Sequence, residues 1–283
     1  MKDFQKKVAV ITGGASGIGR ALAEKSLREG MTVVLADIEE QALHQTADAL
    51  RELGGEVLPI QTDVSDAASV EALAEAVFAR YGAVNLLFNN AGVAAGSAVW
   101  ESSLEDWKWV LGVNLWGVIH GVHYFVPRML AQNAACHIVN TASAAGLIAS
   151  SGLGVYKVSK HGVVTLSETL ALELAARNAH IKVSVLCPEW VDTHLVDAER
   201  NRPDLLKNVP ADASADAEKQ ANMQALAQVL KAGLNPSQVA DAVFDAIQEE
   251  KFYIITHPTT KVAVQRRVED IVNDRTPRDI WRG

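Results

Sequence analysis

Short apolar runs alternate along this chain with longer segments in which apolar residues recur every three or four positions. The short runs are rich in Val and Ile, which is typical of buried strands, and the longer segments have the period of amphipathic helices. Since parallel strands need crossover connections, usually helices, the alternation predicts an α/β fold: a doubly wound parallel sheet with helices on both faces. The expected strands are 8–12, 32–36, 56–60, 84–88, 137–140, 182–186 and 252–256, and the expected helices include 41–53, 67–81, 155–177 and 239–250.

The chain length favours one domain over two. Its 283 residues are 49% hydrophobic and 21% charged, enough to bury a large core, so we expect a single domain over residues 1–283. Two segments depart from the alternation. Residues 192–232 are polar and contain Pro203 and Pro210, which predicts a helical excursion that covers the substrate site, and residues 258–283 form a charged, partly helical C-terminal extension.

Composition excludes several function classes. A net charge of -8 argues against a nucleic-acid surface, which needs clustered Lys and Arg. The N-terminal residues show no signal-peptide core, and no run of 18 consecutive apolar residues occurs, so we expect a cytoplasmic protein without a membrane partner. Cys136 and Cys187 lie in apolar strand patterns without metal-ligand spacing. They are expected to be buried packing residues, and no metal site is predicted.

A glycine-rich turn follows the first expected strand. In residues 12–19, TGGASGIG, the glycines permit a tight turn that brings backbone N–H groups and a helix N-terminus against a pyrophosphate. Glycines also occur in ordinary turns, so the motif alone is weak evidence for a dinucleotide site. Its position between a strand and a helix strengthens that interpretation. The residues expected to contact a dinucleotide here are Gly13, Ser16, Gly17, Ile18 and Gly19.

Asp37 ends the second expected strand, 18 residues after Gly19. A carboxylate at this place accepts hydrogen bonds from both hydroxyls of an adenosine ribose and repels a 2′-phosphate, which favours NAD(H) over NADP(H). The alternative is that Asp37 only caps the next helix. Further cofactor contacts are expected after the second, third and fourth strands, from Ile38, Asp63, Val64, Asn90, Ala91 and Gly92.

A tyrosine and a lysine are placed for proton transfer. Tyr156 and Lys160 are four residues apart in a helical pattern, so their polar ends project from one face. A free tyrosine near pKa 10 is a poor base at neutral pH, but a neighbouring ammonium and the positive nicotinamide ring of NAD⁺ favour the phenolate. Ser143, at the end of the fifth strand, can hydrogen-bond the substrate oxygen and stabilise the charge that develops there.

Asn114 is an amide inside the apolar helical run 110–115, where the pattern favours a hydrophobic residue. A buried amide needs hydrogen-bond partners. Two interpretations stay open: Asn114 orders a water next to Lys160 and links the site to solvent, or it is a structural amide satisfied by neighbouring backbone.

The order of these motifs resembles that of the short-chain dehydrogenase/reductase family. The resemblance spans about residues 6–256, and its motifs are residues 12–19, residues 89–92, the four polar residues above and residues 188–193. It implies a Rossmann-like sheet of seven strands, a homotetramer or homodimer, and a tetrad in which Tyr156 is the general base in oxidation and the general acid in reduction. The resemblance also implies that Asn114 relays protons and that Ser143 orients the substrate. It implies that Lys160 binds the nicotinamide ribose and lowers the pKa of the tyrosine. Pro188, Val191 and Thr193 are implied to lie near the nicotinamide.

One departure from the family pattern concerns the substrate pocket. Glu189 and Trp190 follow Pro188 where the family usually has Pro-Gly. Glu189 either accepts a hydrogen bond from a second substrate hydroxyl or points to solvent, and Trp190 is expected to shape the pocket. Three other tryptophans, Trp100, Trp107 and Trp109, are expected to pack or to form subunit contacts. The predicted pocket residues are Val93, Leu147, Ile148, Leu153, Glu189, Trp190 and Leu195, a largely apolar set.

The sequence therefore predicts an NAD(H)-dependent oxidoreductase that transfers hydride between the nicotinamide and a secondary alcohol or ketone, with a bulky apolar or aromatic small-molecule substrate. One alternative is a 3-oxoacyl-(acyl carrier protein) reductase, which normally uses NADPH and a basic docking surface, so Asp37 and the acidic balance disfavour it. The other is a non-catalytic nucleotide-binding sensor, which has no need of a tyrosine activated by a lysine. The pattern does not specify the substrate, the physiological direction or the stereochemistry.

Overall fold

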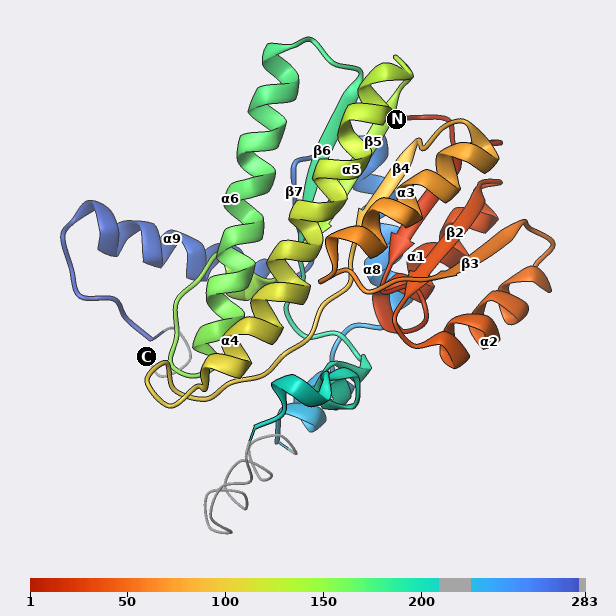
Figure 1. The fold of residues 1–283 in the computed structure, drawn as a ribbon. Coiled ribbons are helices and arrows are strands. Elements are labelled where there is room, and N and C mark those ends of the chain that lie inside the picture. Colours follow the sequence, from red (N-terminus) through yellow and green to blue (C-terminus); the bar gives the residue numbers. More distant parts are fainter. Residues whose placement is uncertain (209–224, 280–283) are drawn as a thin grey trace.

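A seven-stranded sheet forms the centre of the protein, in a computed structural model that describes residues 1–208 and 225–279 (Figure 1). All strand pairs are parallel and the strand order is β3-β2-β1-β4-β5-β6-β7, which confirms the predicted doubly wound, Rossmann-like fold. The predicted strands match the observed ones to within two residues at each end. They are β1 (Val8–Thr12), β2 (Thr32–Asp37), β3 (Val57–Gln61), β4 (Leu86–Asn89), β5 (Cys136–Thr141), β6 (Ile181–Cys187) and β7 (Tyr253–Ile255).

Helices cover both faces of the sheet because successive side chains of each strand point to opposite sides. Ala9 and Ile11 of β1 pack in the core of the face covered by α1 (Gly17–Arg28), α2 (Glu40–Arg51) and α8 (Pro236–Gln248). Val8 and Val10 pack in the core of the opposite face. That face is covered by α3 (Ala67–Tyr81), α5 (Gly117–Ala131) and α6 (Gly154–Ala176).

The sheet order places one set of loops together. β1 pairs with β2 on one side and with β4 on the other. The first three strands are therefore added towards one edge of the sheet and the later strands towards the other, and the order reverses between β1 and β4. In doubly wound sheets, ligands bind at the carboxyl ends of the strands at such a reversal. The loops after β1, β4, β5 and β6 therefore surround a common site.

One long helical stretch changes its winding in the middle. α4 (Leu104–Leu111) continues through a π-helical segment, η1 (Gly112–Trp116), into α5, where a regular α-helix was expected around Asn114. The whole stretch, Leu104–Ala131, is long and apolar enough to cross a membrane by length and composition. Its α5 part packs against α3 and contributes Phe125 and Met129 to the sheet core, which is the position of a core helix.

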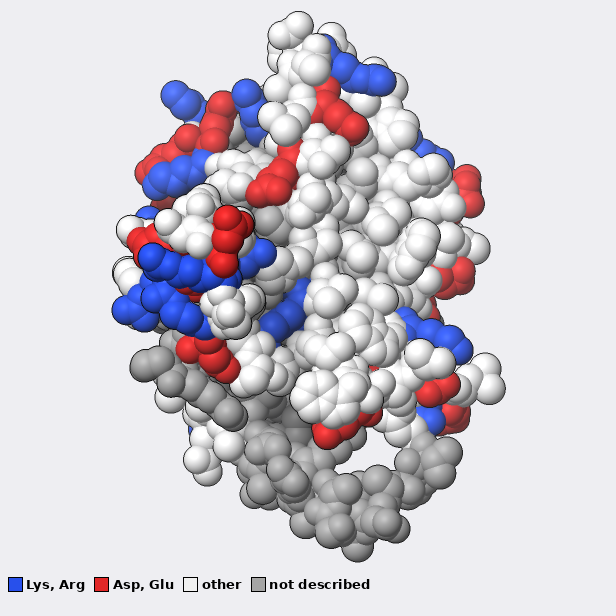
Figure 2. All heavy atoms as spheres, turned by 90° about the vertical axis from the view of Figure 1, so that its left-hand side faces the viewer, with Lys and Arg blue, Asp and Glu red and all other residues white. Residues whose placement is uncertain are grey.

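After β6 the chain leaves the sheet. Two short 3₁₀ segments, η3 (His194–Asn201) and η4 (Asp204–Leu206), begin the predicted excursion, residues 225–231 are helical, and residues 209–224 of the prediction lie outside the described residues. Beyond β7, α9 (Pro258–Val272) projects from the body (Figure 1). On the face shown in Figure 2, described Lys and Arg side chains stand beside Asp and Glu rather than forming an uninterrupted basic area.

Both cysteines behave as the sequence predicts. Cys136 begins β5 and Cys187 ends β6, and both are free thiols buried in the sheet. Burial raises the pKa of the Cys136 thiol to about 11 and that of Cys187 to about 12. Neither is a reactive thiolate at neutral pH.

Candidate active site

The glycine-rich turn after β1 lies against the loop after β4. Gly13 has a positive φ of 63°, and a Cβ there would lie 2.8 Å from Ala91 Cα. A Cβ on Gly19 would lie 1.9 Å from Gly13 O. Because side chains at these two positions would collide with backbone, glycine allows the turn to close tightly and leaves the start of α1 facing the cleft.

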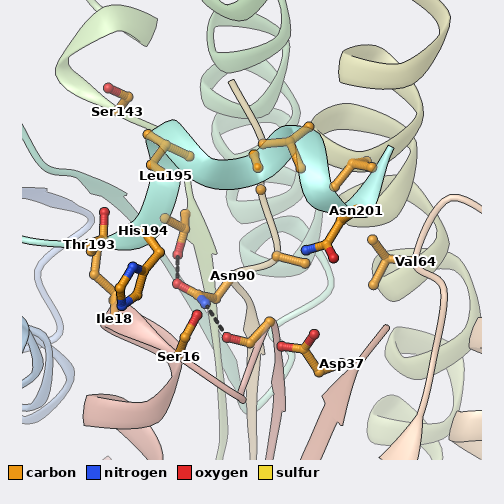
Figure 3. Close-up of a pocket in the computed structure, with 18 of the residues that line it drawn as sticks. Ser16, Ile18, Asp37, Val64, Asn90, Ser143, Thr193, His194, Leu195 and Asn201 are labelled. Atoms are coloured by element: carbon orange, nitrogen blue, oxygen red, sulfur yellow. Dashed lines mark hydrogen bonds between the residues drawn. The ribbon is translucent and has the colours of Figure 1, made fainter. Parts of the chain in front are cut away.

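Thr12 and Asn90 tie the same two loops together. Thr12 Oγ1 accepts hydrogen bonds from Asn90 N at 2.9 Å and Ala91 N at 3.1 Å. Asn90 Nδ2 donates to Thr12 O at 3.1 Å, and Asn90 Oδ1 accepts from Thr141 Oγ1 at 3.3 Å; Figure 3 draws hydrogen bonds of Asn90 at the centre of the site. The floor of the cleft is therefore a network across the ends of β1, β4 and β5.

Asp37 lies at one end of the cleft, at the end of β2. Its Oδ2 accepts from Ala15 N at 3.0 Å and its Oδ1 accepts from Glu39 N at 3.1 Å. Burial raises the pKa of this carboxyl, and the backbone N–H bonds partly offset that rise. The carboxylate thus holds the turn that leads into α2 and also lines the cleft, but the N-cap residue of α2 is Glu39 rather than Asp37.

Most predicted cofactor residues meet in this single cleft. Gly19 does not line it but lies buried behind the turn. The predicted cofactor residues that line it are Gly13, Ser16, Gly17, Ile18, Asp37, Ile38, Asp63, Val64, Asn90, Ala91, Gly92, Tyr156, Lys160, Pro188, Val191 and Thr193.

The proton-transfer residues converge at the other end of the cleft. Ser143 follows β5, while Tyr156 and Lys160 project from the first turns of α6. Lys160 Nζ lies 5.7 Å from the centre of the Tyr156 ring and donates a hydrogen bond to Thr141 O at 2.9 Å. Ser143 Oγ donates to Pro188 O at 3.4 Å, and its hydroxyl is close enough to Tyr156 to lower the pKa of the phenol. The expected serine, tyrosine and lysine therefore line the same cleft, with the lysine behind the tyrosine ring.

Burial dominates the protonation of this pair. It lowers the pKa of Lys160 to about 8, and it raises the pKa of Tyr156 while the hydrogen bond with Ser143 lowers it. In the protein alone the pKa of Tyr156 is therefore raised, whereas the expected lowering includes the positive nicotinamide ring of bound NAD⁺. The reason is that loss of water disfavours the phenolate, and the ammonium donates to Thr141 O.

Asn114 is fully buried in the π-helical segment. Its Oδ1 accepts from Val93 N at 2.8 Å, and its Nδ2 donates to Val93 O at 2.9 Å and to Ser159 Oγ at 3.0 Å. These contacts match the structural interpretation of the amide. They also fix Val93, a cleft residue, and join η1 to α6 beside Lys160.

The predicted substrate residues separate into two groups. Val93, Glu189 and Leu195 line the cleft, whereas Leu147, Ile148, Leu153 and Trp190 are not among the described residues that line it. Glu189 Oε2 accepts from Thr259 Oγ1 at 2.8 Å and Thr260 Oγ1 at 3.1 Å. The carboxylate therefore holds the first turn of α9, a contact that neither sequence interpretation of Glu189 included.

The cleft also has wall residues that sequence reasoning missed. Trp109 of α4 is buried and lines the cleft in addition to packing, and an aromatic residue in an apolar helix gave no sign of this. η3 runs along the cleft and supplies further walls (Figure 3). The excursion was predicted to cover the site, but of its residues only Leu195 and Thr193 were singled out. The missed lining residues include Glu39, Thr62, Val113, Thr141, Ala142, His194, Ala198, Arg200, Asn201 and Leu230.

Two arginines fasten this covering segment, which we define as residues 194–208. Arg200 forms a salt bridge with Glu39, with 2.6 Å between Nη2 and Oε1. Arg202 is buried, lies 2.8 Å from Asp106 Oδ1 through Nη1, donates from Nε to Leu206 O at 2.6 Å and stacks over Trp109. The segment is thus tied to the end of β2 and to α4. Among the described residues, no group of three His, Cys, Asp or Glu side chains is placed to hold a metal ion.

Comparison with known proteins agrees with this geometry. A family model described as short chain dehydrogenase matches residues 7–204. A CLA biosynthesis dehydrogenase/reductase of Lactiplantibacillus plantarum is 36% identical over 98% of this chain and 97% of its own, and a cyclohexanol dehydrogenase of Acinetobacter sp. (strain SE19) is 36% identical over 73% of this chain and 81% of its own. The crystal structure of a short chain dehydrogenase/reductase from Burkholderia phymatum in complex with NAD is 50% identical, with a TM-score of 0.93 and 99% of each chain covered.

Proposed function

The chain belongs to the short-chain dehydrogenase family and is an oxidoreductase that acts on CH–OH groups, and from this premise we propose that it interconverts a bulky apolar or aromatic secondary alcohol and its ketone with NAD(H). The observation that carries the proposal is the meeting of Ser143, Tyr156 and Lys160 at one end of a cleft whose other end holds Asp37. One end provides proton transfer, and the other accommodates an adenosine ribose.

The residues of the cleft fit NAD. The closely packed turn around Gly13 and Gly19 leaves room for backbone approach to a pyrophosphate, and Asp37 presents a carboxylate where the ribose hydroxyls of adenosine would lie. The Burkholderia phymatum relative, which was solved with NAD, supports the assignment. When bound, the nicotinamide supplies the hydride acceptor for oxidation and the hydride donor for reduction.

The side chains at the catalytic end act on the reacting oxygen. Tyr156 accepts the alcohol proton in oxidation and donates it in reduction. Because burial raises its pKa, the phenol of the protein alone is protonated at neutral pH. Ser143 hydrogen-bonds the substrate oxygen where negative charge develops. Lys160 places a positive charge 5.7 Å from the Tyr156 ring, which favours the phenolate once the proton has left.

The walls support an apolar substrate. Val93, Trp109 and Leu195 line the cleft, and Val113 and Leu230 extend the apolar lining. An apolar wall gains free energy from a bulky hydrocarbon in proportion to the area removed from water. The similarity to a cyclohexanol dehydrogenase supports an alicyclic or comparable substrate.

The location and assembly are also proposals. We infer a cytoplasmic enzyme that forms a homotetramer or homodimer, with the excursion 192–232 as a cover over the bound reactants and residues 258–283 as a C-terminal extension of a single domain. Cell fractionation tests the location, and light scattering on the purified protein measures the number of subunits.

Initial rates test the proposal directly. We would measure NADH and NADPH formation or consumption with acyclic, alicyclic and aryl secondary alcohols and their ketones, and include a 3-oxoacyl thioester as the competing substrate class. Activity with NAD(H) on bulky apolar members is expected. Faster NADPH-dependent reduction of the thioester would replace this proposal with the 3-oxoacyl reductase alternative, and NADH binding without any turnover would favour a sensor.

A further inference from the structure

We propose that Glu39 is a second determinant of cofactor choice, because its salt bridge withholds Arg200 from the 2′-phosphate of NADP(H). The inference rests on the proposed use of NAD(H) and assigns to Glu39 a role separate from that of Asp37. It concerns one salt bridge at the adenosine end of the cleft.

The contact between the two side chains has the geometry of a bidentate pair. Arg200 Nη2 lies 2.6 Å from Glu39 Oε1, and Arg200 Nε donates to Glu39 Oε2 at 3.2 Å. Asn201 Nδ2 adds a third hydrogen bond to Glu39 Oε1 at 2.9 Å. The guanidinium edge that suits a phosphate is thereby occupied by a carboxylate of the same chain.

The pair lies where a 2′-phosphate would be. Asp37, Glu39, Arg200 and Asn201 all line the cleft, and Figure 3 shows the Asn201 side chain on the covering segment above Asp37. One of the ribose hydroxyls that Asp37 would bind is the one that carries the 2′-phosphate in NADP(H). The phosphate would therefore lie near Arg200. The side chains of Arg200 and Glu39 are 40% and 28% exposed, which leaves both accessible from the cleft.

Charge decides the direction of the effect. Asp37 and Glu39 contribute two negative charges here and Arg200 one positive charge, so the adenosine end repels a dianionic phosphate. Loss of the Glu39 charge removes one repulsive group and frees the Nε–Nη2 edge of the Arg200 guanidinium, whose Nη1 still donates to Asp197 O at 2.8 Å. That edge binds phosphate through paired N–H donors. Phosphate binding then needs no basic residue near the Gly-rich turn, because Arg200, 161 residues after Glu39, supplies the cation.

A simpler reading of the contact is a latch. In that case the salt bridge only holds residues 194–208 over the cleft, and breaking it from either side has the same consequence. The two readings differ in what Glu39→Gln and Arg200→Gln do to NADPH. The specificity role predicts opposite responses, and the latch predicts equal ones.

The experiment measures dissociation constants of NADH and NADPH by nucleotide fluorescence, without an alcohol substrate. The variants are Glu39→Gln, Arg200→Gln and the double change, each also made in an Asp37→Asn background so that repulsion by Asp37 does not hide the effect. Glu56→Gln is the matched control, because it removes a carboxylate paired with Arg80 at 3.1 Å far from the cleft. Circular dichroism verifies that each variant is folded.

The expected result is that Glu39→Gln tightens NADPH binding about tenfold, an effect of the size of one charge-assisted hydrogen bond, and that adding Arg200→Gln cancels the gain. Equal tightening with and without Arg200 would overturn the role of the arginine. The latch would be the better explanation, and the specificity role refuted, if NADPH binding tightened in neither background. The same conclusion would follow if both single variants lost NADH affinity equally while their NADPH affinity stayed unchanged. A wild-type protein that binds neither nucleotide, or both equally, would instead refute the proposed cofactor.

Discussion

The two arginines that hold residues 194–208 are two positions apart, yet they hold this segment in different ways. The Arg202 side chain is 1% exposed and its salt bridge to Asp106 is enclosed by Trp109. Arg200 is 40% exposed and meets Glu39 at the rim of the cleft. A buried pair is costly to break and a rim pair is nearly neutral, so we infer that Arg202 anchors the segment and that Arg200 tunes what it covers.

The same contrast separates the ends of the cleft. Ser143 directly follows β5, and Tyr156 and Lys160 stand on α6, so their geometry is set by elements of the sheet core. The adenosine end is completed by a segment that crosses from β6 and depends on its side-chain ties. Changes at the catalytic end should alter chemistry, and changes at the covering segment should alter binding and local opening.

Tyr156→Phe tests the catalytic end and carries the largest expected effect. We expect turnover to fall about 10³-fold, because the phenol that moves the proton is lost, while NADH binding stays close to that of the wild type. Steady-state rates and nucleotide fluorescence measure the two quantities. Tyr81→Phe, which removes a hydroxyl bonded to Glu56 away from the cleft, is the control. Turnover that survives in the Tyr156 variant would refute the proposed acid and base.

Arg202→Met tests the anchor. The change leaves the buried Asp106 carboxylate without its counter-charge, although Asn208 Nδ2 and Ser103 N still donate to it, and we expect a loss of about 3 kcal/mol in the free energy of unfolding. Urea denaturation and the rate of proteolytic cleavage within residues 194–208 measure the loss. Adding Asp106→Asn should restore part of it, because the amide carries no charge to be paired and its oxygen can still accept from Ser103 N. A loss below 1 kcal/mol would remove the distinction between the two arginines.

Lys160→Met tests whether the catalytic end carries a cost in stability. The pKa of Lys160 is lowered from 10.5 to about 8 by burial, so below pH 8 the folded protein holds an ammonium in a site that disfavours it. That cost is about 3 kcal/mol at pH 7. Between pH 8 and 10.5 the unfolded chain binds more protons than the folded one, so the wild type gains stability relative to the variant as the pH rises.

Urea denaturation of the unliganded protein at pH 7, 8, 9 and 10 measures this difference. Packing differences between Lys and Met add an offset that does not depend on pH, so the slope isolates the titration of Lys160. We expect the variant to be the more stable protein at pH 7 and the gap to close towards pH 10. A gap that stays constant from pH 7 to 10 would show that Lys160 titrates with its ordinary pKa.

What the sequence predicts correctly is local. Strand positions follow from short apolar runs. Asp37 and Ser143 reach the cleft because they stand at strand ends, and Tyr156 because it shares a helix face with Lys160. The winding of the sheet then brings strand ends together without further information. For these residues, the spacing along the chain is enough to predict that they lie at the same edge of the sheet.

What the sequence misses depends on contacts between distant segments. Arg200 meets Glu39 across 161 residues, and Glu189 meets the threonines at the start of α9 across 70 and 71. Neither partner has a local pattern that marks it. The π-helical winding around Asn114 and the raised pKa of Tyr156 were missed for a related reason, since both arise from packing around the residue.

Asp37→Asn tests the charge at the adenosine end and is expected to act on binding alone. Removing the carboxylate lifts its repulsion of a 2′-phosphate and weakens its bonds to ribose hydroxyls, so the preference for NADH over NADPH should fall about tenfold. The ratio of kcat/KM values for the two cofactors measures the preference. The kcat with saturating NADH should stay near that of the wild type. An unchanged ratio would refute the cofactor argument from this residue.

Arg200→Gln is expected to have the smallest effect on stability, and it completes the comparison with Arg202. The salt bridge with Glu39 joins two partly exposed side chains, so its loss should change the free energy of unfolding by less than about 1 kcal/mol. Urea denaturation beside Arg202→Met, at low and at high salt, measures the difference. The small loss should shrink further in high salt, because exposed charges are screened, whereas the effect of the Arg202 change should persist. Equal losses for the two variants would show that both arginines anchor the covering segment, and the tuning role of Arg200 would then lack its physical basis.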